Sequence, residues 1–176
     1  VGERAARDNS QDIEDVLTGA DMVFVTAGEG GGTGTGGAAI VAGIARDLGA
    51  LTVAVVTKPF SFEGKRRADN AEHGIEKLRD ACDTLITIPN DRLLQQEDKT
   101  ISINEAFSKA DEVLFNGVQG ITDLISTPGL INVDFADVKS VLADSGAALM
   151  GIGLASGNDR ASKAPDAAIN STLLEY

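Results

Sequence analysis

The stretch Ala27-Gly-Glu-Gly-Gly-Gly-Thr-Gly-Thr-Gly-Gly37 decides how the rest of the sequence is interpreted. It follows the apolar run Met22-Val-Phe-Val-Thr26 and precedes a pattern typical of a helix over 36–48, so it lies at a strand–helix junction. Glycines allow positive φ angles, and their N–H groups, together with a helix N-terminus, bind phosphate. Thr33 and Thr35 add hydroxyl donors. A flexible surface loop is the alternative, but it does not explain the position of the glycines at this junction.

The composition fits one cytosolic domain. The chain has 176 residues, of which 43% are hydrophobic and only 4% aromatic, so aliphatic side chains and alanine must fill the core. The net charge of -12, with Lys65–Arg67 as the only clear basic run, argues against nucleic acid and against direct membrane binding. Cys82 is the single cysteine, which excludes an internal disulfide and fits a reducing compartment.

Apolar runs alternate with helical patterns along the chain. This alternation predicts a three-layer, Rossmann-like α/β fold with a largely parallel sheet. The expected strands are 22–26, 51–57, 84–88 and 149–154. The expected helices are 1–18, 36–48, 65–81, 91–95 and 104–125, a short helix after 132–137, and a last helix over 162–174.

The two ends of the sequence predict a domain that is truncated on both sides. A helix at 1–18 leads directly into the strand that carries the phosphate loop, which is an unusual beginning for a parallel sheet. The last residues, Leu173–Tyr176, stop inside an amphipathic pattern without a helix stop signal. We therefore expect this segment alone to bind nucleotide weakly.

Two common nucleotide-binding motifs fit poorly. Gly32–Gly37 matches G-x-G-x-x-G, but a dinucleotide-binding fold needs an acidic residue about 20 positions later, and Val56–Pro59 contains none. A Walker A loop is also absent from the sequence, because no Gly-Lys-Ser/Thr follows the glycines.

Five segments together resemble the tubulin/FtsZ family of GTPases, which includes the bacterial cell-division filament protein. The segments are Gly30–Gly36, Val55–Arg67, Ile88–Leu94, Asn116–Ile121 and Asn132–Asp137. The resemblance covers essentially the whole chain. It implies a partial GTP-binding domain over 1–139, including a long core helix at about 104–126. It also implies that 140–176 are a link region and the start of a C-terminal domain.

The resemblance also implies the residues that contact a guanine nucleotide. Several of them have another interpretation from sequence alone. Glu63 and Arg67 have the spacing of a solvated i,i+4 pair. Asn90 could be a turn residue, and Phe107 could be a core residue. Asp111 lies four residues after Phe107, so both share one helix face, and its carboxylate can accept both guanine N–H donors, which adenine lacks. The implied contacts are Gly30, Gly31, Gly32, Thr33, Gly34, Thr35, Gly36, Glu63, Arg67, Asn90, Phe107 and Asp111.

Catalysis is implied to need a second copy of the chain. Asn132, Asp134 and Asp137 match the loop that members of this family insert into the nucleotide site of the next subunit. Helix capping explains Asp134 and Asp137 as well, and both roles are compatible. The sequence shows no metal site formed by protein ligands alone, and Mg2+ is expected only with the nucleotide.

The resemblance predicts a cytoplasmic protein at the division site that binds GTP and GDP and hydrolyses GTP. It would assemble head to tail into filaments of the division ring and bind adaptor proteins through regions outside this chain. Two other classes stay open at this point: a module that binds or caps a filament end without turnover, and a dinucleotide-dependent oxidoreductase.

Overall fold

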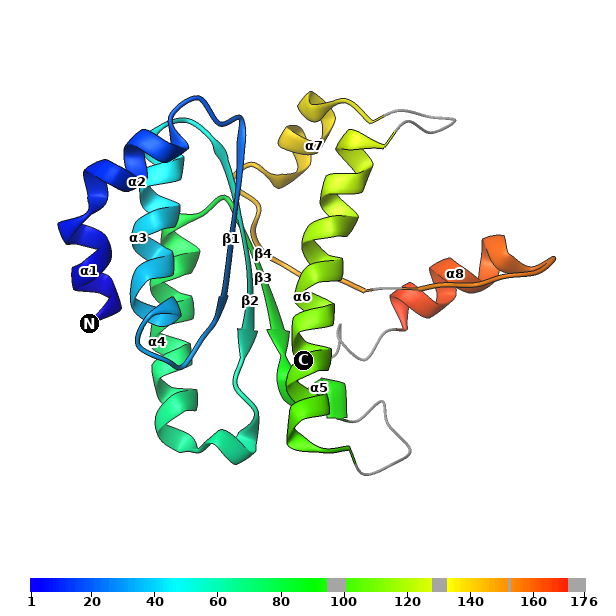
Figure 1. Cartoon of the computed structure of the whole chain (residues 1–176). Coiled ribbons are helices and arrows are strands. Elements are labelled where there is room, and N and C mark those ends of the chain that lie inside the picture. Colours follow the sequence, from blue (N-terminus) through cyan, green and yellow to red (C-terminus); the bar gives the residue numbers. More distant parts are fainter. Residues whose placement is uncertain (95–100, 128–132, 152, 171–176) are drawn as a thin grey trace.

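The strand β2, Leu51–Lys58, is the centre of the packing, because every residue from 51 to 57 is buried. The computed structural model describes residues 1–94, 101–127, 133–151 and 153–170 (Figure 1). A strand that is buried on both faces must be apolar throughout, which explains the continuous run in the sequence.

The sheet is four-stranded and parallel. Its order is β1-β2-β3-β4, with β1 at Met22–Gly28, β3 at Thr84–Pro89 and β4 at Gly146–Ala148. Gly28 pairs with Thr57, and Pro89 pairs with Lys58. The register therefore brings the carboxyl ends of β1, β2 and β3 to one edge, which is where open parallel sheets bind ligands.

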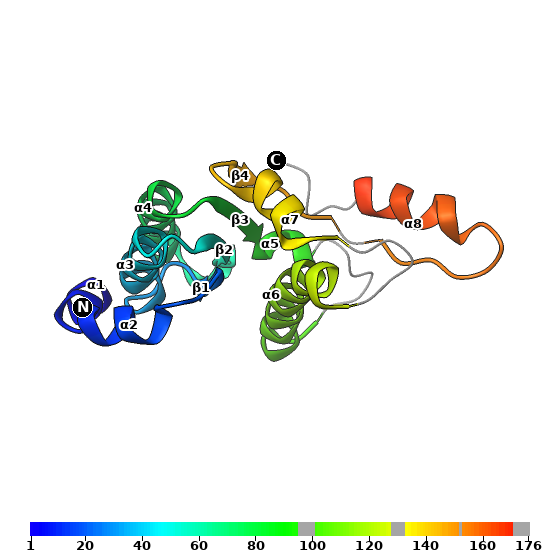
Figure 2. The same ribbon diagram turned by 90° about the horizontal axis from the view of Figure 1, so that it is seen from above.

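Helices cover the two faces of the sheet, as Figure 2 shows from above. On one face lie α3 (Gly34–Asp47) and α4 (Lys65–Ala81), with α1 (Gly2–Asp8) and α2 (Ser10–Leu17) packed outside α3. The other face carries α6 (Ile103–Ser126), α5 (Asn90–Leu94) and α7 (Phe135–Leu142). The expected three-layer α/β architecture is confirmed.

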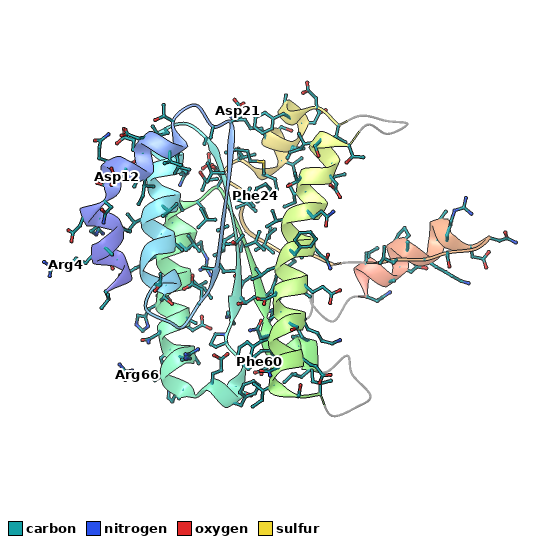
Figure 3. The ribbon with its side chains drawn as sticks, in the orientation of Figure 1. Arg4, Asp12, Asp21, Phe24, Phe60 and Arg66 are labelled. Carbon is teal, nitrogen blue, oxygen red and sulfur yellow. The ribbon has the colours of Figure 1, made fainter. Side chains whose placement is uncertain are left out.

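The core has two parts, one on each face of the sheet. Ala54 and Val56 of β2 pack towards α3 and α4, where Ala38, Ala42 and Leu78 are buried. The small alanines let α3 lie close to the strands. The alternating residues of β2 and β3 pack towards α6, together with Phe24 (Figure 3). They include Val53, Val55, Ile86 and Ile88.

The helix α6 is the longest in the part of the chain that is described, at 24 residues. It begins after Ser102, whose hydroxyl accepts the Glu105 N–H at 3.3 Å while the Glu105 carboxylate accepts the Ser102 N–H at 2.7 Å. This reciprocal pair fixes its start. At 1.5 Å per residue, α6 is about 36 Å long.

The expected single helix at 1–18 is wrong. Two helices form, with a break at Asn9, whose φ is -114° and whose side chain donates to the Ala5 carbonyl oxygen at 2.8 Å. Asparagine competes in this way with the helix hydrogen bonds of the backbone. Val16, which the pattern assigned to the apolar side, is 83% exposed.

The expected strand at 149–154 is also wrong, because β4 lies earlier. After Ala148 the chain leaves β3, and Met150 packs on α6, where a Cβ on Gly117 would lie 3.0 Å from the Met150 methyl group. Met150 is thus used for helix packing, whereas Leu149 and Leu154 are exposed. The last helix, α8, is Arg160–Ile169, and the rest of the prediction at 171–174 lies outside the described residues. The division at 139/140 remains a prediction; β4 follows it in sequence and pairs with β3.

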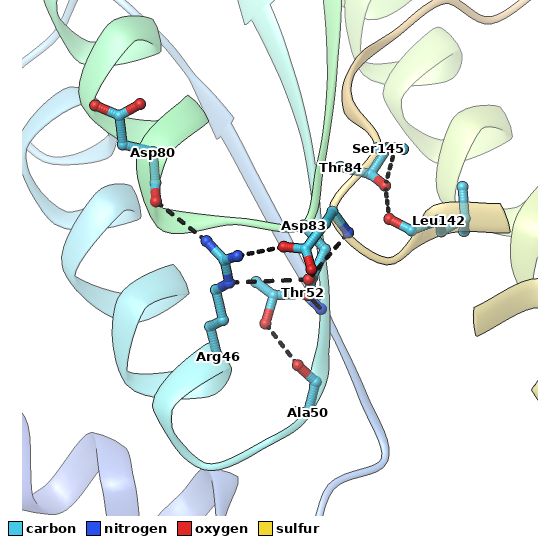
Figure 4. Close-up of polar contacts among 9 residues, drawn as sticks. Arg46, Ala50, Thr52, Asp80, Asp83, Thr84, Leu142 and Ser145 are labelled. Carbon is cyan, nitrogen blue, oxygen red and sulfur yellow. Dashed lines mark hydrogen bonds and ion pairs between the residues drawn. The ribbon is translucent and has the colours of Figure 1, made fainter. Parts of the chain in front are cut away.

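A polar cluster ties the opposite, amino-terminal edge of the sheet together (Figure 4). Asp83, next to β3, accepts the buried Thr52 N–H at 2.8 Å and the Asp144 N–H at 3.4 Å. Arg46, near the end of α3, lies 3.8 Å from Asp83, pairs with Asp144 and donates to the Asp80 carbonyl oxygen. Asp83 therefore connects β2, β3 and the turn before β4.

We predict that Asp83→Ala lowers the free energy of unfolding by about 2–4 kcal/mol, because it leaves the buried Thr52 N–H without an acceptor and Arg46 without one carboxylate. Asp80→Ala is the matched control. It removes an exposed carboxylate but keeps the carbonyl oxygen that Arg46 uses, so a change within about 0.5 kcal/mol is expected. Urea unfolding of both variants measures the difference; equal effects would contradict the role of Asp83.

Candidate functional site

The glycine loop has the backbone geometry that the sequence predicts. It connects β1 to α3, and Gly30 has a φ of +104°, with its hypothetical Cβ only 2.7 Å from the Arg67 carbonyl oxygen. A Cβ on Gly34 would lie 2.8 Å from the Gly28 carbonyl oxygen, and one on Gly36 2.5 Å from the Glu3 nitrogen. These three glycines therefore allow close packing of the chain against itself.

Other positions of the loop, Gly31 to Thr33, are open to a ligand. A Cβ on Gly31 or Gly32 would meet nothing within 4 Å. Thr33 is exposed at the N-cap position of α3 and makes no side-chain capping bond. Thr35 has a structural role, because its Oγ1 accepts the Gly30 N–H at 2.7 Å. The open positions precede the positive end of the α3 dipole, which favours an anion there.

Beside the loop lies a cavity of about 210 Å³ at the carboxyl edge of the sheet. It brings together residues that are far apart in sequence and that the family resemblance selected: Gly31, Glu63, Arg67, Asn90, Phe107 and Asp111. The remaining walls are Gly28, Glu29, Thr57, Pro59, Ala110 and Leu114. Of the predicted phosphate-binding residues at 30–36, Gly31 lines this cavity.

Glu63 and Arg67 form an ion pair, but not within one helix. Glu63 ends the short 3-10 helix η1, Ser61–Glu63, and Gly64 separates it from α4 with a φ of +97°. One Glu63 carboxylate oxygen accepts from Arg67 at 2.6 Å, and the other accepts the Phe60 N–H at 2.9 Å. Both side chains are thus held at the cavity wall.

Asn90 is the first residue of α5 and is only 4% exposed. Its Oδ1 is buried and has no hydrogen-bond partner among the described residues. The neighbouring Asp91 accepts the Ser61 N–H at 2.9 Å, which ties η1 to α5. A buried amide oxygen without a partner is costly in a folded protein, and a ligand donor in the cavity would satisfy it.

Phe107 and Asp111 lie on the side of α6 that faces the cavity. Phe107 is 39% exposed, and its ring meets those of Phe60 and Phe62 edge-on, with centroids 5.3 and 6.2 Å apart. Phe60 marks this end of the molecule in Figure 3. Asp111 follows one turn later and is exposed. An aromatic face next to a carboxylate suits a planar base that carries N–H donors.

The predicted acidic loop lies elsewhere. Asp134 occupies the N-cap position of α7 without a side-chain capping bond of its own, and Asp137 accepts the Asp134 N–H at 3.3 Å, so a capping contact is present for Asp137. Both residues are exposed. Figure 1 shows α7 beside the C-terminal end of α6, whereas Phe107 and Asp111, which line the cavity, lie in the first turns of α6. Asn132 lies outside the described residues.

Glu29 is a site residue that the sequence reasoning missed. It is 5% exposed, and burial raises the pKa of its carboxyl, which the nearby Thr35 hydroxyl partly opposes. The signal was present in the quoted loop, because a carboxylate among glycines that are predicted to bind phosphate would repel the negative charge of the phosphate.

Two further features are absent from the described residues, 1–94, 101–127, 133–151 and 153–170. None of the helices in these ranges is apolar over a length that could cross a membrane. No group of three or more His, Cys, Asp or Glu side chains within them is placed to hold a metal ion. Cys82 is buried, and burial with the neighbouring Asp83 raises the pKa of its thiol to about 11, so it is an unreactive core residue.

Comparison with known proteins places the chain in a family context. Residues 1–98 match the model of the Tubulin/FtsZ family, GTPase domain. Among solved structures, an FtsZ dimer from M. jannaschii is 50% identical over 98% of this chain, with a TM-score of 0.94. A mutant FtsZ from the same organism is 49% identical over 99%, with a TM-score of 0.95. CetZ from Methanosaeta thermophila, at 21% identity over 98% and a TM-score of 0.76, shares the fold.

The chain spans about half the length of these solved relatives. It covers 50% of the FtsZ dimer's chain, 52% of the mutant's and 48% of the CetZ chain.

We predict that Gly30→Ala lowers the free energy of unfolding by about 1–3 kcal/mol, because the new Cβ would need a left-handed backbone and would overlap the Arg67 carbonyl. Gly31→Ala, where the space is open, should change it by less than about 1 kcal/mol. Thermal unfolding of the two variants measures this contrast. Equal destabilisation would mean that the close contact at Gly30 does not constrain the loop.

Proposed function

The chain belongs to the tubulin/FtsZ family, and from that premise we propose that it carries the guanine-nucleotide site of a GTPase. The observation that supports this proposal is the cavity beside the glycine loop. Four separate chain segments bring a phosphate loop, an ion pair, an unpartnered amide oxygen and an aromatic ring with a carboxylate to its walls.

Each part of a guanine nucleotide has a counterpart at this cavity. The N–H groups of Gly31 and Gly32 and the start of α3 would bind the phosphates. Glu63 and Arg67 would bind the ribose, and the Asn90 amide oxygen would accept from the sugar or the base. Mg2+ bound to the phosphates would offset part of their charge.

The base would be selected on α6. Its plane would lie against the Phe107 ring, and the Asp111 carboxylate would accept the ring N–H and the exocyclic amino group of guanine. Adenine has no such donor pair, so it would leave a carboxylate without partners. A nicotinamide dinucleotide is disfavoured, because β2 ends at Lys58, which pairs with Glu72 at 2.7 Å, and offers no acid for a ribose.

Hydrolysis would be completed between two copies of the chain. Asp134 and Asp137 lie beyond the C-terminal end of α6, whereas Phe107 and Asp111 lie near its start, so the acidic loop is remote from the cavity of its own chain. In a head-to-tail assembly, these carboxylates and Asn132 would orient the attacking water at the neighbour's nucleotide. Such heterologous contacts generate filaments when they do not close into a ring.

The cellular role follows from this assembly. We propose that the complete polypeptide forms filaments of the cytoplasmic division ring and binds adaptor proteins through segments outside this chain. Residues 1–139 would be the nucleotide-binding part, and 140–176 would be the link and the beginning of a second domain. A solved FtsZ dimer, 50% identical to this chain, supports self-association.

The first test concerns the base. Asp111→Asn in the complete polypeptide replaces one acceptor oxygen with a donor, so guanine binding should weaken by on the order of 1–3 kcal/mol, and the preference for GTP over xanthosine triphosphate should fall. Competition binding measures this preference. Glu112→Gln, an exposed neighbour on the same helix, should keep the wild-type preference. Unchanged discrimination in Asp111→Asn would show that another group reads the base.

The second test concerns catalysis in trans. Asp137→Ala should bind GTP and assemble but hydrolyse slowly, whereas Gly34→Ser should bind poorly, because its Cβ would lie 2.8 Å from the Gly28 carbonyl oxygen. Mixing the two should restore turnover, since one supplies nucleotide and the other supplies the carboxylate. Asp137→Asn keeps an acceptor for the Asp134 N–H, so slow turnover in it as well would separate catalysis from capping. Mixtures that co-assemble without recovery would contradict a shared site.

A further inference from the structure

Glu29 is a buried acid in a loop that is built to hold an anion. Its backbone N–H donates to the Thr57 carbonyl oxygen at 3.0 Å, which fixes the residue level with the end of β2. The residue is 5% exposed, and neither carboxylate oxygen has a hydrogen-bond partner of normal geometry among the described residues. An ionised carboxylate in this position carries a desolvation cost that the nearby Thr35 hydroxyl offsets only in part.

The side chain lies between the loop and α4. A Cβ on Gly74 would overlap the Glu29 Oε2 atom, so only glycine leaves room for this carboxylate. The Thr35 methyl group lies 2.5 Å from the same Cβ position, and the Thr35 hydroxyl oxygen holds the Gly30 N–H. Glu29 thus lies beside Thr35, the residue that holds the loop at Gly30, and also lines the cavity.

The charged groups around Glu29 do not neutralise it. From α4, Arg67 pairs with Glu63 and Lys77 with Glu3 of α1, while Lys58 of β2 pairs with Glu72. His73, next to Gly74, is exposed, and its ring bonds the Asp69 carbonyl oxygen. The first three turns of α3 carry no charged residue, and α6 adds the carboxylate of Asp111. Burial is accordingly the main cause of the raised pKa of the Glu29 carboxyl.

We propose that Glu29 takes up a proton from solvent when the cavity binds a polyphosphate, so that nucleotide binding and protonation of Glu29 strengthen each other. This inference rests on the proposed function. Two like charges close together in a poorly solvated site repel, and removing one of them by protonation relieves that repulsion. Coupling of this kind is reciprocal: a proton on Glu29 favours the phosphates as much as the phosphates favour the proton.

The sign of the pH dependence follows directly. The neutral acid predominates below the pKa of Glu29, which burial raises above the ordinary value of a glutamate, and nucleotide binds best there. As the pH rises through that pKa, the carboxylate ionises and binding weakens, by up to about tenfold per pH unit for one proton. Stability changes in the same direction, because the buried charge costs more in the folded state than in the unfolded chain.

The test uses GDP, which avoids turnover, and the complete polypeptide. Calorimetry in buffers of different ionisation enthalpy, from about pH 5 to 8, gives affinity and proton uptake together. Wild type should take up more protons on binding GDP than Glu29→Gln, by a difference approaching one, and the variant should bind about tenfold tighter than wild type at the highest pH. The protons that GDP itself binds cancel in this comparison.

Two further variants complete the design. Glu76→Gln removes an exposed carboxylate of α4 outside the proposed site and should behave as wild type. Glu29→Met, apolar and of similar length, should also lose the pH dependence, and thermal unfolding checks that each variant is folded. Identical proton uptake in wild type and in folded Glu29→Gln or Glu29→Met, with GDP bound by all of them, would overturn the role of Glu29. Failure of every protein to bind GDP would overturn the proposed function, and the inference with it.

Discussion

The hydrogen-bonded register of β2 with its two neighbours is the constraint on which the site depends. Thr57 is level with Gly28, and Lys58 is level with Pro89. Because the three strands are parallel, the glycine loop, η1 and α5 all begin at one edge of the sheet. The strand can hold this position because it is buried on both faces, between the alanine-rich face of α3 and the long helix α6. A shift of one residue would turn each of its side chains to the opposite layer.

Much of the fold could be predicted because local patterns and tertiary packing agree. The continuous apolar runs gave the strands at 51–57 and 84–88, and the helix at 65–81 has the predicted bounds. The apolar run at 149–154 misled, since hydrophobicity alone does not distinguish pairing with β3 from packing of Met150 on α6. The break at Asn9 depends on one side-chain hydrogen bond that periodicity does not register.

The site was predictable in part. Residues such as Glu63, Asn90 and Phe107 were found through the family resemblance, since spacing alone was compatible with surface, turn or core roles. Their convergence on one cavity results from contacts between segments far apart in sequence. Glu29 was missed for a related reason: its burial depends on Gly74 in α4, which leaves space where any other residue would place a Cβ. The sequence of the loop alone therefore does not predict that Glu29 is buried, because the burial depends on a helix that is distant in sequence.

The length of α6 has a consequence for how this chain can change during evolution. The helix separates the cavity wall at its first turns from α7 beyond its last turn. Inserting or deleting one residue within it would shift α7 by about 1.5 Å and rotate it by about 100° about the helix axis. The exposed residues of α6 outside the cavity wall can vary in identity, whereas the length of the helix is constrained. The helix therefore acts as a spacer of fixed length. Insertions and deletions should accumulate in the segments on either side of it rather than within it.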